Sequence, residues 1–271
     1  MKMTEYPEGD LVLSDIFLID GTEGTRKISA EAVWKVFLDS LPGECHNSIF
    51  RGKNLGSGLT PTQKSNLANG TFKDMWLGDY WEINGVRWRI AHFDYWYNSG
   101  ATALAKHHAV VVPDTNLYTA KMNDSSTNDS GYTGSSLYLT GLDQAKQAVT
   151  NAFGSYAIAH YDRYSKQFPV TSGAEWEWKN DVVNLMNEEM VFGSMKFGTM
   201  KYTVSRSQLA LFAMCPKFIA NNENYWLNNP SQRYGAGAIT GFAGVGSTGI
   251  PDYFGDTGNT IGVRPAVAIG Q

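Results

Sequence analysis

Histidines with nearby acids are the residues of this sequence that could perform catalysis or bind a metal. His107 and His108 are adjacent, and adjacent residues of a strand point to opposite faces, so the pair cannot easily converge on one ion. His92, Asp94 and His160 could form a hydrolytic set with a serine, but no glycine pattern of a nucleophile elbow accompanies them. We therefore expect structural or solvent-exposed roles for these side chains and assign no catalytic residue.

Clusters of acids and amides could hold a hard cation. Four oxygen-bearing residues gather in one polar segment: Asn123, Asp124, Asn128 and Asp129. Their spacing lacks the glycine and the terminal glutamate of an EF-hand loop. Four glutamates fall on one predicted helix: Glu175, Glu177, Glu188 and Glu189. These are expected to form its solvated face and its cap. We expect neither a metal nor a cofactor.

The cysteine content and the charge exclude several classes of protein. Cys45 and Cys215 are the 2 cysteines of the chain, too few for a disulfide framework and without zinc spacing, so both are expected to be buried thiols. The net charge of −4 argues against nucleic acid as the main partner. No apolar run approaches the roughly 18 residues of a membrane span. The polar, acidic N-terminus does not resemble a secretory signal, so synthesis is expected in the cytoplasm.

The C-terminal region is rich in groups suited to contact instead of catalysis. Residues 221–271 carry many glycines and asparagines and few charges. Tyrosine provides contact area at low entropy cost, and asparagine provides adaptable hydrogen bonds. Ordinary turns are the alternative interpretation. The candidate ligand-binding residues are Asn221, Asn222, Asn224, Tyr225, Asn228, Asn229, Tyr234 and Tyr253.

The N-terminal segment is predicted to form a small structural unit of its own. Residues 16–19 and 25–28 are predicted to form a hairpin around a glycine-bearing turn. Ser29 then caps an amphipathic helix that stops at Pro42-Gly43. So short a unit buries little surface alone and needs a partner, either another copy or a larger assembly. We divide the chain into an attachment segment, residues 1–43, and a domain, residues 44–271.

The strongest local signal is Asn84-Gly85, a dipeptide typical of a type I′ turn, inside the aromatic run of residues 80–89. A two-residue loop fixes the register of both strands. Trp81 and Trp88 then face each other as structural residues. The predicted pairs are Tyr80–Arg89, Trp81–Trp88, Glu82–Arg87 and Ile83–Val86.

Periodicity and turn signals predict the remaining elements. Thr60, Pro61 and Gln63 give a capping box for a helix that ends at Gly70. The other predictions are a buried strand at 109–112, a surface loop at 121–136, helices at 142–153 and 172–193, a short apolar segment at 209–214, and strands at 225–227 and 263–267 that flank a long loop system.

Short motifs spread over nearly the whole chain carry a resemblance to known proteins. Tyr225-Trp226-Leu227 and Gly262-Val263-Arg264-Pro265-Ala266-Val267 resemble the end of a C-type-lectin-like fold, in the branch of the formylglycine-generating enzymes and the variable proteins of bacteria and phages. Residues from about His46 to Gly270, with Gly78-Asp79-Tyr80-Trp81 and His107-His108, look like a family of phage and prophage proteins. Residues 18–28 are similar to the particle-anchoring segments of phage fibres.

The resemblance implies an α+β fold, in which an antiparallel sheet with flanking helices supports long, irregular C-terminal loops. Trp226 and Arg264 would be structural, and the guanidinium of Arg264 needs a carboxylate or several carbonyls. The calcium triplets of sugar-binding lectins do not occur here, since Asn228-Asn229-Pro230 has no carboxylate. The closely spaced cysteine pair of the formylglycine-generating enzymes is also missing.

The expected function is that of a non-enzymatic virion protein, of the tail-fibre or head-fibre type. Residues 1–43 would attach to other virion proteins or oligomerise, with a trimer expected from fibre analogy, and the domain would bind a host-surface glycan or protein. Many weak contacts multiplied over several copies raise avidity by about 10²–10⁴. Two alternatives stay open: a capsid decoration protein without a specific ligand, and an enzyme that acts on cell-wall polysaccharide through two carboxylates about 5–9.5 Å apart.

Overall fold

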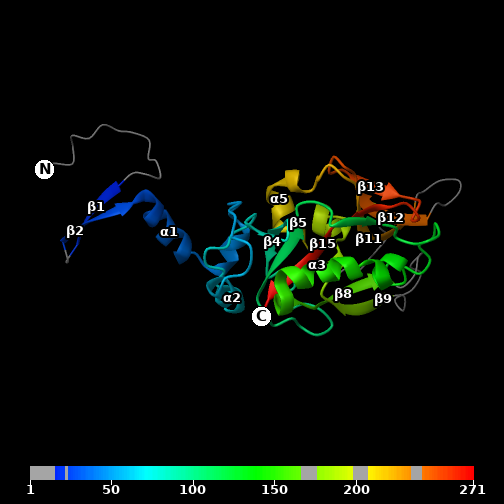
Figure 1. The fold of residues 1–271 in the computed structure, drawn as a ribbon, viewed down its shortest axis with the longest axis horizontal. Coiled ribbons are helices and arrows are strands. Elements are labelled where there is room, and N and C mark those ends of the chain that lie inside the picture. Colours follow the sequence, from blue (N-terminus) through cyan, green and yellow to red (C-terminus); the bar gives the residue numbers. More distant parts are fainter. Residues whose placement is uncertain (1–15, 22–23, 166–175, 198–206, 233–239) are drawn as a thin grey trace. The chain divides into compact units, whose positions relative to one another are not determined.

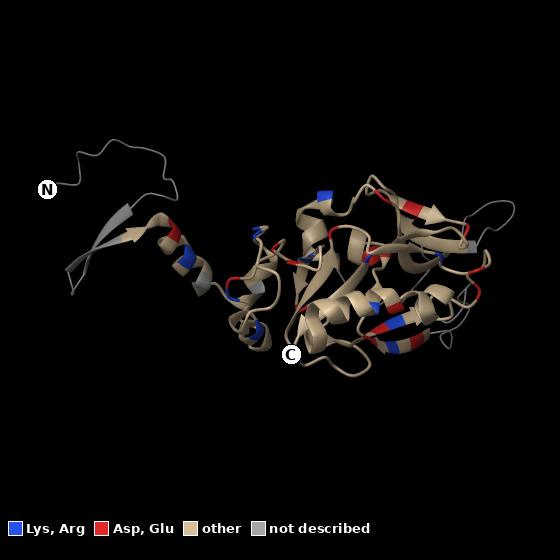
Figure 2. Cartoon of the chain, viewed as in Figure 1, with Lys and Arg blue, Asp and Glu red and all other residues tan. Residues whose placement is uncertain are grey.

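The computed structural model describes residues 16–21, 24–165, 176–197, 207–232 and 240–271 (Figure 1). The chain divides into two compact units, Met1–Pro42 and Gly43–Gln271. The fold of the larger unit is α+β, with mostly antiparallel sheets. Over the described ranges, no helix combines the length and the apolar character that crossing a bilayer requires. Figure 2 shows charged residues scattered thinly along the ribbon, as the charged content of 18% implies.

The smaller unit contains the predicted hairpin and helix. Strands β1 (Ile16–Gly21) and β2 (Gly24–Ser29) pair in antiparallel fashion, and α1 (Ala30–Ser40) follows directly. Ser29 caps α1, since its hydroxyl accepts a hydrogen bond from the Ala32 amide at 3.1 Å. Ala30 and Leu38 are buried. Val33, Trp34, Val36 and Phe37 of the same helix are exposed, and we call these four side chains the α1 apolar face.

The larger unit is built on one central sheet whose strand order is β10-β15-β5-β4-β3, with β7 also paired to β15. The C-terminal strand β15 therefore lies inside the sheet and not at its edge. A bulge between Ile90 and His92 shifts the register of β4 against β5. The strands are β3 (Tyr80–Ile83), β4 (Val86–Phe93), β5 (His108–Pro113), β7 (Ala157–Ile158), β10 (Asn184–Leu185) and β15 (Pro265–Gly270).

The hairpin β3–β4 confirms the register that Asn84-Gly85 predicts. Both turn residues have positive φ, 52° and 77°, as a type I′ turn requires. All four predicted cross-strand pairs are present. Trp81 and Trp88 are buried, and the guanidinium groups of Arg87 and Arg89 lie 4.5 and 4.9 Å from the centre of the Tyr80 ring.

Alternation along the central strands gives the sheet two apolar faces. In β5, Ala109 and Val111 pack on one side, while Val110 and Val112 pack on the other. The first side is covered by α2 (Pro61–Ala68) and α3 (Asp143–Phe153), and the second by α4 (Glu188–Phe192), α5 (Ala210–Met214) and part of a second sheet. Burial on both faces explains why β5 and β15 are apolar at nearly every position.

The second sheet carries the C-terminal coils. Its strand order is β13-β12-β11-β14-β6, in which β14 runs parallel to β11 and antiparallel to β6. A third core cluster, which includes Tyr132, Tyr164 and Trp226, packs against it. A separate pair of strands, β8 and β9, is antiparallel. The bounds are β6 (Tyr118–Ala120), β8 (His160–Ser165), β9 (Trp176–Asp181), β11 (Tyr225–Gln232), β12 (Thr240–Val245), β13 (Pro251–Phe254) and β14 (Ile261–Val263).

The helix predicted at 172–193 is wrong. Where the structure describes this segment, it forms β9, then the two-residue strand β10, and only then the short helix α4. Trp176 and Trp178 alternate along β9 opposite Ser165 and Arg163, and such pairing outweighs the helical spacing of the apolar residues. The prediction that the glutamates form a solvated helix face is also wrong. Glu188 is fully buried, and Glu177 accepts a hydrogen bond from the Thr133 hydroxyl.

Two predicted loops are more ordered than expected. In the 121–136 segment, Met122, Asn128 and Tyr132 are fully buried, so only part of it is a surface loop. The long C-terminal loop system contains the strands β12 and β13. Cys45 and Cys215, expected to be buried, are partly exposed free thiols.

Candidate functional site

A polar depression of about 380 Å³ lies where β6 and β14 meet the coil before β11. The parallel pairing of Tyr225 with Gly262 brings this coil beside the start of β14. The Asn224 carbonyl accepts a hydrogen bond from the Gly262 amide at 3.1 Å, which holds the two segments together. The lining residues are Asn116, Thr119, Asn222, Glu223, Asn224, Ser247, Thr260, Ile261 and Gly262.

Asn116 organises this depression. Its amide nitrogen donates to Glu223 Oε2 at 2.8 Å and to the Asn224 carbonyl at 3.1 Å. Its amide oxygen accepts from Asn221 Nδ2 at 2.8 Å. A Cβ atom on Gly262 would clash with the Asn116 side-chain amide, so only glycine leaves room for this side chain. The coil is therefore held in one conformation by a single amide.

Several groups at the rim have no partner within the described part of the chain. Asn224 Oδ1 accepts from the Ser247 amide at 2.8 Å, but no contact engages its Nδ2. The side-chain amide of Asn222 and Glu223 Oε1 are likewise unengaged. Asn222, Glu223 and Asn224 are exposed, and Asn222 has a φ of 66°. The depression thus offers donors and acceptors from a fixed coil.

The structure brings some of the predicted ligand-binding residues to this depression. Asn222 and Asn224 line it, and Asn221 supports it through Asn116. Tyr253 is half-buried in β13 and does not belong to the lining. The eighth candidate, Tyr234, lies outside the described residues.

The other three candidates, Tyr225, Asn228 and Asn229, are wrong as surface ligand groups, because β11 buries all of them. The Tyr225 hydroxyl donates to the Ile219 carbonyl at 2.9 Å. Asn228 Nδ2 donates to the Leu185 carbonyl at 2.8 Å, and Asn229 Oδ1 accepts from the Glu188 amide at 2.8 Å. The side chains of Tyr225, Asn228 and Asn229 thus connect β11 to neighbouring segments. The asparagine content of the sequence does not reveal that these groups are used inside the fold.

The residues predicted to be structural are buried. Trp226 donates its indole N–H to the Ala120 carbonyl at 2.9 Å and so joins β11 to β6. Arg264 lies where the chain passes from β14 in one sheet to β15 in the other. Its guanidinium donates to the carbonyls of Pro113, Ile219 and Phe218 at 2.8 to 3.0 Å. The charge is therefore compensated by carbonyls, the second of the two expected environments.

Sequence reasoning misses Asn116, Glu223 and Ser247. Asn116 lies more than 100 positions before the coil that it organises, and no local pattern marks such a residue. Glu223 lies between the candidates Asn222 and Asn224 in the sequence, and this position alone would have justified its inclusion among the candidate ligand-binding residues. Gly262, which enters the sequence analysis only as part of a motif, makes the approach of Asn116 possible.

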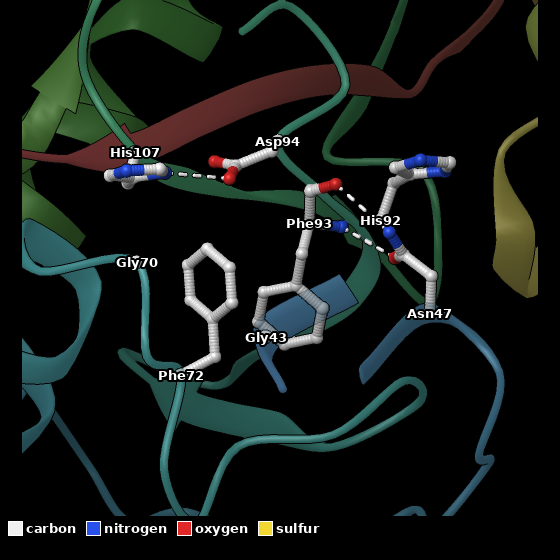
Figure 3. A pocket seen from close by; sticks show the side chains of 8 residues that line it. All are labelled: Gly43, Asn47, Gly70, Phe72, His92, Phe93, Asp94 and His107. Carbon is white, nitrogen blue, oxygen red and sulfur yellow. Dashed lines mark hydrogen bonds and ion pairs between the residues drawn. The ribbon is translucent and has the colours of Figure 1, made fainter. Parts of the chain in front are cut away.

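A second cavity, of about 320 Å³, contains an oriented imidazole (Figure 3). Asp94 Oδ2 lies 2.7 Å from His107 Nδ1, and Asp94 Oδ1 accepts from the His108 amide at 2.9 Å. The ring of Tyr97 stacks on His107 at 4.4 Å. A carboxylate oxygen accepts, so His107 Nδ1 donates in this contact. The lining residues are Gly43, Asn47, Gly70, Phe72, His92, Phe93, Asp94 and His107.

The backbone around this second cavity is strained. Phe72 has a φ of 49°, a region that bulky residues rarely adopt, whereas aspartate tolerates the φ of 58° found at Asp94. The amide of Asn47 is fully used by the backbone of Phe93, with contacts of 2.7 and 3.0 Å. The lining includes no serine, threonine or cysteine. The cavity therefore presents one oriented imidazole, and no hydroxyl or thiol nucleophile is among its lining side chains.

The structure groups the histidines differently from the hydrolytic set considered from sequence. Asp94 contacts His107 and His108, while His92 Nδ1 accepts from the Ala210 amide at 3.1 Å. Burial, together with the nearby His108, lowers the pKa of His92 to about 4. Burial likewise lowers the pKa of His108 to about 4. His160 instead stacks on Trp96 at 3.6 Å. His92 and His108 are thus uncharged packing groups at neutral pH.

Neither cavity shows a cluster of acids. Within the part of the chain that the structure describes, no group of three or more His, Cys, Asp or Glu residues is placed to hold a metal ion. Asn123 and Asn128 point their amides at backbone carbonyls instead. Each cavity is lined by one carboxylate, Glu223 in the first and Asp94 in the second. A polysaccharide-cleaving mechanism requires a pair.

Comparison of the chain with models of known families, with curated proteins and with solved structures gives no match. The function therefore has to be inferred from the geometry and chemistry of the chain itself.

Proposed function

We propose that this chain is a structural protein of a bacteriophage particle, of the tail-fibre or head-fibre type, which binds a ligand on the host surface. The observation that carries the proposal is the polar depression, where Asn222, Glu223 and Asn224 present unengaged groups from a coil that Asn116 and Gly262 hold in place. Preorganised polar groups at a rigid edge favour recognition over chemistry.

The larger unit is proposed to be a C-type-lectin-like domain. In support, the central sheet is antiparallel and includes the C-terminal strand β15, and α2 and α3 cover one of its faces. The second sheet is formed by the long connections and carries the exposed coil. The ligand would be a host-surface glycan or a protein.

The smaller unit is proposed to attach the protein to the particle and to join copies of the chain. The α1 apolar face supports this proposal, because its side chains are 43 to 66% exposed, including Trp34 at 52%. Apolar side chains grouped on one helix are typical of an interaction surface. A homotrimer is proposed from fibre analogy alone. Deletion of residues 1–43 is expected to abolish incorporation into particles, and normal incorporation would contradict the attachment role.

The binding role is tested by adsorption of the labelled full-length chain to a panel of bacterial cells. We expect saturable adsorption by the natural chain, and a loss of about tenfold or more in the N222A/N224A double variant, since two rim amides disappear. The matched control is Asn151→Ala, an exposed amide on α3 that lies outside the depression. Adsorption of the natural chain without saturation would favour a decoration protein. Equal adsorption by N222A/N224A and Asn151→Ala would favour it as well.

A further inference from the structure

The rim of the polar depression combines hydrogen-bond donors with acceptors. Asn222 and Asn224 each offer an unengaged amide N–H₂, whereas Glu223 Oε1 and Asn222 Oδ1 are acceptors. Thr119, Ser247 and Thr260 add hydroxyls, which act as both. A ligand that satisfies this set must itself donate and accept at closely spaced positions. Adjacent hydroxyl groups of a sugar ring have this property.

The charge of the lining restricts the ligand further. Glu223 is the one ionisable side chain among the residues that line the depression, and no Lys, Arg or His is among them. An anionic ligand would place its charge near this carboxylate without a cation to compensate it, which is repulsive at short range. Asn116 fixes Glu223 through the contact to Oε2, so the carboxylate cannot easily turn away.

The size and the surface character of the depression agree with a small polar ligand. Its volume of about 380 Å³ falls in the range of small-molecule sites. No aromatic ring is among the lining residues, so binding depends on hydrogen bonds and is expected to be weak at each site, with affinity gained through several copies.

We infer that the depression binds an uncharged, hydroxyl-rich sugar and discriminates against the corresponding acidic sugar through Glu223. The inference rests on the proposed binding function and specifies the ligand class of that same site. Asn116 acts as a positioning residue, because it orients Glu223 and the Asn224 backbone through its own contacts.

The experiment uses the full-length chain and three matched pairs of sugars: glucose and glucuronic acid, galactose and galacturonic acid, mannose and mannuronic acid. Each acid differs from its hexose by a carboxylate at one carbon, and binding is measured by titration NMR. We expect at least one hexose to bind saturably and its acid to bind about tenfold more weakly. In Glu223→Gln this difference should disappear, because the amide keeps the shape and removes the charge.

A matched control separates local from general effects of charge. Asp143→Asn removes one carboxylate on α3, where the side chain is 68% exposed, and it should leave the discrimination unchanged. Equal or tighter binding of the acidic sugar by the natural chain would overturn the inference. The same holds if the difference between hexose and acid persists in Glu223→Gln.

Adsorption to cells, measured on the same preparation, distinguishes the inference from the proposed function. If the chain adsorbs saturably but no hexose binds, the ligand class is wrong while the attachment role stands. If a hexose binds with the expected dependence on Glu223 but cells are not adsorbed, the ligand class stands while the attachment role is wrong. The Asn116→Ala variant should weaken hexose binding while its thermal unfolding stays cooperative.

Discussion

At the scale of single residues, Arg264 shows how a buried charge can join two sheets. The side chain is 1% exposed and donates to three backbone carbonyls. The ring of Tyr225 lies 5.1 Å from its guanidinium carbon. The planar guanidinium spreads five N–H donors over three nitrogens and so reaches all three carbonyls, whereas the donors of a lysine ammonium all start from one nitrogen atom.

We predict that Arg264→Lys lowers the free energy of unfolding by about 3 kcal/mol, because carbonyls are left without donors and the charge stays buried. Urea unfolding followed by tryptophan fluorescence measures the change. Arg87→Lys is the control, since the side chain of Arg87 is 45% exposed, and it should alter stability by less than about 0.5 kcal/mol. Similar losses in both variants would contradict the joining role of Arg264.

The buried histidines predict a dependence of stability on pH. His92 and His108 have pKa values lowered to about 4 in the folded chain, against an ordinary value of 6.5. As the pH falls below 6.5, the unfolded chain takes up these protons first, so the free energy of unfolding decreases until the pH reaches about 4. The loss is on the order of 3 kcal/mol for each histidine.

Urea unfolding at a series of pH values from about 7 down to about 4 tests this dependence. In His92→Asn, the amide oxygen can replace Nδ1 as the acceptor for Ala210, and the variant no longer titrates in this range. Its stability should therefore fall less steeply with decreasing pH than that of the natural chain. Parallel curves would show that His92 is not a buried neutral group.

At the scale of elements, the β3–β4 turn allows a prediction with a closely matched control. Gly85 has a φ of 77°, and a Cβ atom added to it would meet no other atom within 4 Å; Gly58 is equally uncrowded but has no left-handed φ. We predict that Gly85→Ala destabilises the chain by about 1 kcal/mol. Gly58→Ala should be neutral or slightly stabilising. Thermal unfolding compares the two, and equal effects would refute the turn assignment.

Elements with local signals can be predicted from the sequence. The Thr60–Gln63 capping box and the β3–β4 register depend on residues within ten positions of each other, and both are confirmed. The helical prediction for the 172–193 segment is wrong. The apolar residues Trp178, Val182, Leu185, Met186 and Met190 fit a helical spacing, but nothing in the segment itself indicates that it pairs with β8. Pairing partners remote in sequence decide such segments.

The candidate site is predictable only in part for the same reason. The asparagine-rich composition of the 221–229 segment predicts exposed amides, and Asn222 and Asn224 are indeed exposed. Asn228 and Asn229 belong to the same segment but are buried. Their hydrogen-bond partners, the Leu185 carbonyl and the Glu188 amide, are about forty positions away. Burial of an amide depends on such partners, which no local pattern specifies.

At the scale of the whole molecule, the two units suggest separate tasks. The larger unit contains the three described core clusters, whereas the smaller unit exposes the α1 apolar face. We predict that the full-length chain is oligomeric and that W34K/F37K shifts it toward the monomer in analytical ultracentrifugation, because two charges would enter the contact. Leu139→Lys, at a position 61% exposed in the larger unit, is the control. A monomeric natural chain would contradict the prediction.

The central position of β15 has a consequence for biosynthesis. Strand β5 has two neighbours in the sheet. Strand β4 precedes β5 in the sequence and is already synthesised when β5 appears. Strand β15 follows β5 by about 150 residues and is synthesised much later. While the ribosome is still producing the intervening segments, the edge of β5 that later pairs with β15 presents unpaired backbone N–H and C=O groups. The nascent polypeptide therefore has to remain open, or be shielded by a chaperone, until residues 265–270 have left the exit tunnel.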